Sequence, residues 1–163
     1  MVRVVQKIKI RMILPFLNKG MRILDLGCGD MWFSNYLKEK GYNVSGFSLC
    51  KPADIVGDVK NYKFKRNYYD VVIAIEMVEH VDCFKEIEEM LKPNGLLIIT
   101  TPTPHLDWFC FLMERVGLFQ SRGDTPHKYL IYLKDIPIFK PILAKTYLFI
   151  QFGVFKKTYE NNC

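Results

Sequence analysis

The sequence predicts a three-layer α/β sandwich, in which a mostly parallel sheet lies between two layers of helices. Short apolar runs without a polar face alternate with amphipathic stretches over residues 20–103. Parallel strands need crossover connections, and right-handed crossovers place helices on both faces of the sheet. Near the end of the chain, residues 145–160 predict two strands around Gly153, an antiparallel hairpin that closes one edge of the sheet.

Length and composition are those of one globular domain. The chain has 163 residues, of which 50% are hydrophobic and 25% are charged. This size is enough to bury a core but short for two domains, and the composition excludes a disordered chain. No segment reaches the roughly 18 uncharged apolar residues that a membrane span needs. The five cysteines form no CxxC pair, which favours reduced thiols in the cytoplasm over a zinc ribbon.

Five strands are predicted in the first two thirds of the chain. Each is a short run of apolar or β-branched residues, as expected for strands that are covered on both faces. Only a few residues, Pro52 among them, separate the second strand from the third, so that connection has no room for a long crossover helix. The five predicted strands cover 21–26, 42–47, 53–58, 70–76 and 96–101.

Amphipathic stretches separate most of these strands. The stretch 31–40 has an apolar stripe at helical spacing and stops at Gly41, a residue that favours a helix C-terminus. The stretch 81–92 is also amphipathic, and the following KPNG predicts a turn that breaks it. Beyond residue 102 we expect a helix within 105–119 and a short helix broken by Pro137.

The stretch ILDLGCGD, residues 23–30, places two glycines directly after the first strand. Ligands of open parallel sheets bind beyond the carboxyl ends of the strands. Glycines at that edge permit a sharp turn and let a ligand approach bare backbone amides. Taken alone, the stretch is equally well explained as a tight turn between a strand and a helix.

Four linked segments give this turn a context: ILDLGCGD, DIVGDV, YYDVVIAIEMVEHV and MLKPNGLLIITTPTP. In order and spacing, over about residues 20–103, they resemble the class I S-adenosylmethionine-dependent methyltransferases, in particular the ubiquinone-biosynthesis-like O-methyltransferase group. The resemblance implies a single Rossmann-like methyltransferase domain over 1–163. Its parts would be an N-terminal helix (1–19), a cofactor-binding core (20–103), and substrate-side helices with the closing hairpin (104–163).

The resemblance also implies S-adenosylmethionine as the cofactor and suggests which residues hold it. The glycine turn would cradle the methionine part of the cofactor, and an acid after the third strand would contact the amine of adenine. A residue near the end of the fourth strand would line the same site. The implied cofactor-binding residues are Asp25, Gly27, Cys28, Gly29, Ser48, Asp58, Val59 and Ile75.

Two positions depart from the family pattern. Met31 stands where the family often has a third glycine, and a larger residue there would crowd the N-terminus of the following helix. Ser48 stands where an acid usually grips both ribose hydroxyls. A serine makes one such hydrogen bond but not a charged bidentate one, and charge-assisted bonds are roughly twice as strong. These departures predict weakened cofactor binding.

The stretch EMVEH, residues 76–80, brings two carboxylates and an imidazole to the same edge of the sheet. Local packing and capping are one explanation of such a set. The set also resembles that of two metal-dependent O-methyltransferase families, those of ubiquinone biosynthesis and those that methylate the 2′-hydroxyl of small RNAs. Carboxylates combined with imidazoles favour Mn²⁺, Fe²⁺, Co²⁺ or Zn²⁺ over Mg²⁺. The implied metal ligands are Glu76, Glu79, His80 and His127, with His105 as the rival for the last place.

We therefore expect an S-adenosylmethionine-dependent methyltransferase that methylates an oxygen of a small-molecule acceptor. One alternative is a metal-dependent RNA 2′-O-methyltransferase, which the EMVEH set and the formal net charge of +6 favour. The other is a non-catalytic binding protein of the same fold, which Met31 and Ser48 favour. The sequence singles out no catalytic residue, and it predicts neither the acceptor nor the oligomeric state.

Overall fold

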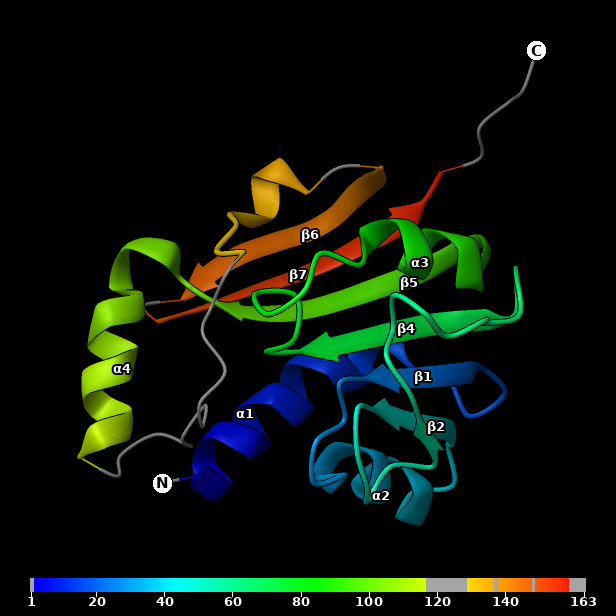
Figure 1. Ribbon diagram of the computed structural model, residues 1–163, viewed down its shortest axis with the longest axis horizontal. Helices are drawn as coiled ribbons and strands as arrows, with labels where there is room; N and C mark the ends of the chain where they lie inside the picture. Colours follow the sequence, from blue (N-terminus) through cyan, green and yellow to red (C-terminus); the bar gives the residue numbers. More distant parts are fainter. Residues whose placement is uncertain (1, 117–128, 137, 148, 159–163) are drawn as a thin grey trace.

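Figure 1 shows the computed structural model, which describes residues 2–116, 129–136, 138–147 and 149–158. One seven-stranded sheet has the order β3-β2-β1-β4-β5-β7-β6. Its strands are β1 Arg22–Leu26, β2 Asn43–Ser48, β3 Ile55–Val56, β4 Tyr69–Ile75, β5 Leu91–Pro102, β6 Phe139–Tyr147 and β7 Ile150–Lys157. The helices are α1 Val2–Ile13, α2 Trp32–Glu39, α3 Phe84–Met90 and α4 Asp107–Arg115, with the 3-10 turns η1 Leu14–Phe16, η2 Pro104–Leu106 and η3 Leu133–Asp135.

The directions of the strands confirm the predicted fold class. The first five strands pair in parallel, and β7 runs antiparallel to both β5 and β6. The carboxyl ends of β1, β4 and β5 point toward the left in Figure 1, where α1 and α4 lie. None of the described helices is long and apolar enough to cross a membrane.

Two apolar clusters, one on each face of the sheet, hold the layers together. Because successive side chains of a strand point to opposite faces, neighbouring residues of β1 join different clusters. Ile23 packs with residues of α1, η1 and α2, whereas Leu24 packs with residues of α3 and η3. The buried helical residues on the first face are Ile13, Phe33 and Leu37, and those on the second are Phe84, Ile87, Met90 and Leu133.

The C-terminal hairpin exists, but its turn was predicted in the wrong place. β6 ends at Tyr147, which pairs with Ile150 at the start of β7, and Gly153 lies in the middle of β7. A side chain at Gly153 would overlap the ring of Phe155. The glycine is therefore needed for close packing within a strand and not for a turn.

Two further elements are shorter than the sequence predicts. The third strand has two residues, because the carboxylate of Asp54 accepts the Gly46 N–H at 2.7 Å, a bond that a longer neighbouring strand would otherwise provide. Helix α3 ends at Met90, because Leu91 already pairs with Tyr69 in the sheet.

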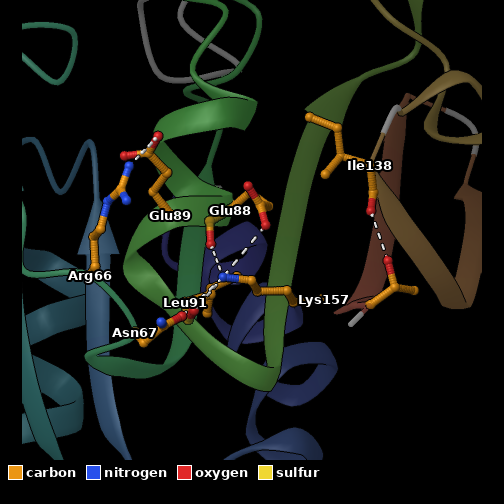
Figure 2. A network of polar contacts seen from close by, with 8 residues as sticks. Arg66, Asn67, Glu88, Glu89, Leu91, Ile138 and Lys157 are labelled. Carbon is orange, nitrogen blue, oxygen red and sulfur yellow. Dashed lines mark hydrogen bonds and ion pairs between the residues drawn. The ribbon is translucent and has the colours of Figure 1, made fainter. Parts of the chain in front are cut away.

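A lysine at the end of β7 ties that strand to α3, as Figure 2 shows. The ammonium of Lys157 donates to the carbonyl oxygens of Glu88 at 2.6 Å and Leu91 at 2.9 Å, and to Asn67 Oδ1 at 3.1 Å. Carbonyls at the end of a helix have no partner inside the helix, and a lysine there satisfies them. This contact lies near the start of β5, at the edge of the sheet opposite the carboxyl ends of the parallel strands.

Candidate functional site

The sheet order places a ligand-binding edge at the carboxyl end of β1. β1 pairs with β2 on one side and with β4 on the other, so the chain leaves β1 in one direction and later returns to its other side. Open α/β sheets bind ligands at such a switch point, beyond the carboxyl ends of the strands. The predicted cofactor residues lie near the end of β1 or just after it, at the end of β2, just after β3, or at the end of β4. The fold thus brings these segments to one edge.

The glycine turn after β1 has a left-handed backbone. The φ angles are 78° at Gly27 and 50° at Gly29, a conformation that favours glycine. A Cβ at Gly27 would lie 2.5 Å from Met77 Cγ, so the turn packs tightly against the segment after β4. At Gly29 a Cβ would meet nothing within 4 Å. The face of Gly29 is therefore open, which fits a ligand that approaches the backbone there.

Met31 does not crowd the start of α2, contrary to the expectation from the sequence. Its backbone is also left-handed, with φ 64°, and its N–H donates to the Cys28 carbonyl at 2.8 Å. The side chain is buried over Gly46, and a Cβ at Gly46 would lie 3.0 Å from the Met31 sulfur. The missing side chain at Gly46 provides the space that Met31 fills.

Asp25 and Cys28 both lie inside the protein. The Asp25 carboxylate accepts a hydrogen bond from the Ser34 hydroxyl at 2.6 Å and so joins β1 to α2. Burial raises the pKa of Asp25 to about 6 and that of the Cys28 thiol to about 12. Cys28 is therefore a neutral thiol. The structure gives Asp25 a role in fixing the turn, and direct contact with a cofactor stays a prediction.

Residues at the end of β2 and just after β3 form the other half of this edge. The carbonyl of Ser48 accepts the Gly57 N–H at 3.0 Å, which holds the two strand ends together. The Asp58 carboxylate accepts the Lys60 N–H at 3.0 Å and the Asn61 side-chain amide at 2.7 Å. Val59 is buried in the core. Asp58 thus orders its own loop, and its predicted contact with adenine is untested.

A lysine from α1 reaches the end of β4, beside the glycine turn. The ammonium of Lys9 lies 2.7 Å from Glu76 Oε1, and the two side chains are 7% and 42% exposed. Glu76 has a left-handed φ of 51°, and its N–H donates to the Thr100 carbonyl at 2.8 Å. The pair therefore combines a buried ammonium with a carboxylate that faces solvent on one side.

Lys9 is not among the site residues predicted from the sequence, although its position carries a signal. Val5, Lys9 and Ile13 lie four residues apart and so share one side of α1. Ile13 is fully buried, and Lys9 is buried with it. A lysine inside an apolar helical stripe needs a partner, because burying an unpaired charge is costly.

Glu79 lies in the interior of the protein, with its side chain fully buried. Burial raises the pKa of Glu79 to about 8, and the Thr101 hydroxyl donates to its Oε2 at 3.2 Å. Its Oε1 has no hydrogen-bond partner among the described residues. The backbone carbonyl of Glu79 accepts the Tyr129 N–H at 2.9 Å, which fixes the segment that returns toward β6.

The predicted metal set is not assembled in the part of the chain that the structure describes. Within that part, no three His, Cys, Asp or Glu side chains gather as metal ligands do. Glu76 is paired with Lys9, and His127 lies outside the described residues. His105, the rival, is on η2, where its Nδ1 lies 3.3 Å from the Tyr132 hydroxyl. The metal site stays a prediction of the resemblance.

The model of a family described as "Methyltransferase domain" matches residues 3–141. The chain belongs to this methyltransferase family. The match includes nearly all of α1, the glycine turn after β1, the ends of β2, β3 and β4, and the segment that follows β5. The resemblance inferred from the four sequence segments is therefore confirmed at the level of the family.

Curated relatives of this methyltransferase-family chain include two ubiquinone biosynthesis O-methyltransferases. The one from Azorhizobium caulinodans is 32% identical over 104 residues, covering 51% of this chain and 41% of the relative. The one from Bradyrhizobium diazoefficiens is 31% identical over 117 residues, covering 60% of this chain and 46% of the relative. The chain thus matches less than half the length of each of these relatives.

Two solved structures with similar folds cover nearly the whole chain. A Pyrococcus horikoshii OT3 protein has a TM-score of 0.69 at 20% identity, and covers 94% of this chain and 92% of its own. An S-adenosylmethionine-dependent methyltransferase from Archaeoglobus fulgidus has a TM-score of 0.69 at 16% identity, with 95% and 94% covered. At these identities the likeness shows the fold alone.

Proposed function

We propose that this methyltransferase-family chain binds S-adenosylmethionine at the carboxyl edge of β1, β2 and β4 and transfers its methyl group to an oxygen of a small-molecule acceptor. The family match and the names of the curated O-methyltransferases support methyl transfer to oxygen. The open face of Gly29 supports a ligand close to the backbone at this edge.

The observation that carries the proposal is the ion pair of Lys9 with Glu76 next to the glycine turn. Met77, the neighbour of Glu76, packs against Gly27, so the half-exposed carboxylate of Glu76 and the buried ammonium behind it lie next to the turn. The amino-acid end of S-adenosylmethionine carries one carboxylate and one ammonium group. Lys9 and Glu76 offer the opposite charges side by side, and such complementarity orients a ligand and rejects wrong ones.

The adenosine end would lie toward the ends of β2 and β3. Ser48 offers one hydroxyl to the ribose, and Asp58 offers a carboxylate that its own loop already holds in place. A neutral hydrogen bond is weaker than a charged one by about half. We therefore expect the amino-acid end to contribute a large share of the affinity.

When bound, S-adenosylmethionine supplies a methyl group on a sulfonium, which is ready for in-line displacement. The role of the protein is to hold the acceptor oxygen in line with the methyl group. Positioning of the two reactants alone lowers the activation barrier of such a displacement substantially. On the acceptor side, η2 presents His105, whose Nδ1 contacts Tyr132. None of the described residues bonds to its Nε2, which leaves that atom available to take the proton of an acceptor hydroxyl.

Calorimetric titration with two ligands tests the proposal. S-Adenosylhomocysteine carries the zwitterionic amino-acid end, whereas 5′-methylthioadenosine has the same nucleoside thioether without it. We expect S-adenosylhomocysteine to bind more tightly, and Lys9→Met to lower only that affinity, by about tenfold for the loss of one charged hydrogen bond. Lys7→Met is the matched control, because Lys7 is an exposed lysine on the same helix.

Each outcome of this titration has a distinct meaning. A wild-type protein that binds neither ligand would refute the cofactor assignment. An equal loss of both affinities in Lys9→Met would refute recognition by the ion pair while leaving the cofactor in place. Binding of S-adenosylhomocysteine without methyl transfer to catechol, used as a probe acceptor, would favour the non-catalytic alternative.

A further inference from the structure

A cleft lies between the loop that follows β3 and helix α3. Residues 60–64 form one wall, and Lys85, Glu86 and Glu89 form the other. Both walls stand on the same face of the sheet, because Phe64 and the buried residues of α3 belong to one apolar cluster. The cleft has a volume of about 380 Å³, which lies within the range of small-molecule sites. None of the residues predicted to hold the cofactor lines this cleft.

One lysine of the cleft is held in place by two contacts. The ammonium of Lys60 lies 2.6 Å from Glu86 Oε1 and donates to the Asp82 carbonyl at 3.0 Å. An ammonium has three N–H groups, and the Lys60 side chain is 46% exposed. None of the described residues accepts from the third N–H. This N–H is therefore left for a ligand, on an ammonium that is already oriented.

The cleft has two positive charges in excess. Both of its carboxylates are neutralised, since Glu86 pairs with the fixed lysine and Glu89 Oε1 lies 3.2 Å from the Arg66 guanidinium. The side chains of Lys63 and Lys85 are exposed, and neither ammonium has a hydrogen bond or ion pair among the described residues. A phosphate monoester carries a charge of about −1.5 to −2 at pH 7. Such a group matches the excess charge of the cleft.

Aromatic side chains supply the apolar part of the cleft. Tyr62 is 40% exposed, and its ring lies 4.7 Å from that of Phe64. From the core, the ring of Phe47 meets the Tyr62 ring edge-to-face at 5.1 Å, which fixes its orientation. Exposed aromatic rings of this kind are surfaces on which nucleobases stack. A phosphate without a ring would leave this surface uncovered, which favours a ligand that carries both groups.

We propose that the cleft binds a free nucleoside monophosphate. The ammonium groups of Lys60, Lys63 and Lys85 hold the phosphate, and the base lies on the ring of Tyr62. The cleft is separate from the candidate cofactor site, so the proposal does not depend on the methyl-transfer function. A nucleotide at the end of an RNA strand presents the same groups, and the experiment separates these two sources.

Calorimetric titration with three ligands tests this assignment. AMP carries both the phosphate and the base, adenosine lacks the phosphate, and ribose 5-phosphate lacks the base. Each ligand is titrated with and without saturating S-adenosylhomocysteine, which fills the adenine position of the candidate cofactor site. We expect AMP to bind at least tenfold more tightly than either of the other two ligands, because both parts of the cleft contribute. S-Adenosylhomocysteine should leave the affinity for AMP unchanged.

Two variants and one control locate the bound AMP. Lys63→Met combined with Lys85→Met should lower the affinity for AMP about tenfold and leave the affinity for adenosine unchanged. Tyr62→Leu should lower the affinity for AMP at least fivefold and leave the affinity for ribose 5-phosphate unchanged. Lys145→Met, which removes an exposed lysine of β6, should change none of these affinities. Circular dichroism establishes that every variant is folded.

Five results would overturn the proposal. The first is a protein that binds none of the three ligands, and the second is an unchanged affinity for AMP in the double methionine variant. The third is ribose 5-phosphate that binds as tightly as AMP, which would mean a site for phosphate alone. The fourth is AMP that S-adenosylhomocysteine displaces, which would place AMP at the cofactor site. The fifth is a short oligoadenylate that binds more tightly than AMP, which would make the end of a nucleic-acid strand the occupant.

These results are distinct from a failure of the proposed function. If S-adenosylhomocysteine does not bind, the cofactor assignment is refuted. The lysine and tyrosine variants still establish whether AMP occupies the cleft.

Discussion

The Lys9 ammonium lies 2.7 Å from the Glu76 carboxylate and joins the N-terminal helix to the end of β4. One partner is buried and the other is 42% exposed. Breaking such a pair from the exposed side leaves a buried charge without compensation, which is more costly than the loss of a surface ion pair. The pair therefore fixes α1 against the edge where the cofactor residues meet.

The Lys9–Glu76 ion pair is expected to weaken the binding of a metal ion at Glu76. A divalent cation at Glu76 must compete with the ammonium of Lys9. We expect Lys9→Met to raise the affinity for Co²⁺ by about tenfold, because it removes one competing charged hydrogen bond of roughly 1.5 kcal/mol. Calorimetry and the visible absorption of bound Co²⁺ measure the change. Lys7→Met serves as the control, and equal Co²⁺ affinities in wild type and Lys9→Met would contradict the prediction.

Alanine substitutions at the two glycines of the turn are expected to affect different properties, stability at Gly27 and ligand affinity at Gly29. Gly27→Ala meets both the left-handed backbone, which costs about 1–2 kcal/mol, and the Met77 side chain. Gly29→Ala meets only the backbone cost, but its Cβ would fill the open face. Thermal unfolding should therefore reveal the larger loss of stability in Gly27→Ala. Calorimetry with S-adenosylhomocysteine should reveal a loss of affinity in Gly29→Ala, and an unchanged affinity would mean that the ligand does not approach Gly29.

Asp25 is expected to make stability depend on pH. Burial raises its folded pKa from 3.8 to about 6, so the folded state binds more protons than the unfolded state between these values. The stabilisation is complete below about pH 4 and is lost as pH rises through 6, for a total of about 3 kcal/mol. The difference in unfolding free energy between wild type and Asp25→Asn should fall by this amount from pH 4 to pH 7. A constant difference across this range would be inconsistent with a buried carboxyl.

Lys157 is expected to contribute to stability without affecting the candidate site. Lys157→Met leaves the Glu88 and Leu91 carbonyls without their ammonium donor, which should cost about 1–3 kcal/mol of unfolding free energy. Its neighbour Lys156 pairs in the sheet through its backbone, but its ammonium has no hydrogen bond or ion pair among the described residues, so Lys156→Met is the matched control. Urea unfolding measures both variants. Affinity for S-adenosylhomocysteine should be the same in both, because this contact lies at the opposite edge of the sheet.

The sequence alone determined the fold class, the positions of β1, β2 and β4, and the segments that meet at the candidate edge. These follow from local properties. Apolar runs such as 70–76 must be covered on both faces, and parallel strands bring their carboxyl ends together whatever the details of packing. The left-handed angles at Gly27 and Gly29 likewise follow from what a short turn after a strand requires of its residues.

Contacts between distant segments were decided only by the tertiary structure. Gly153 suggested a turn, yet it lies within β7 because the ring of Phe155 needs the space. Met31 suggested crowding, yet Gly46 of the neighbouring strand makes room for it. Lys9 meets Glu76 only once α1 has packed against the sheet, and no local pattern states which carboxylate a buried ammonium will find. Such contacts depend on the relative placement of whole elements, which local propensity does not encode.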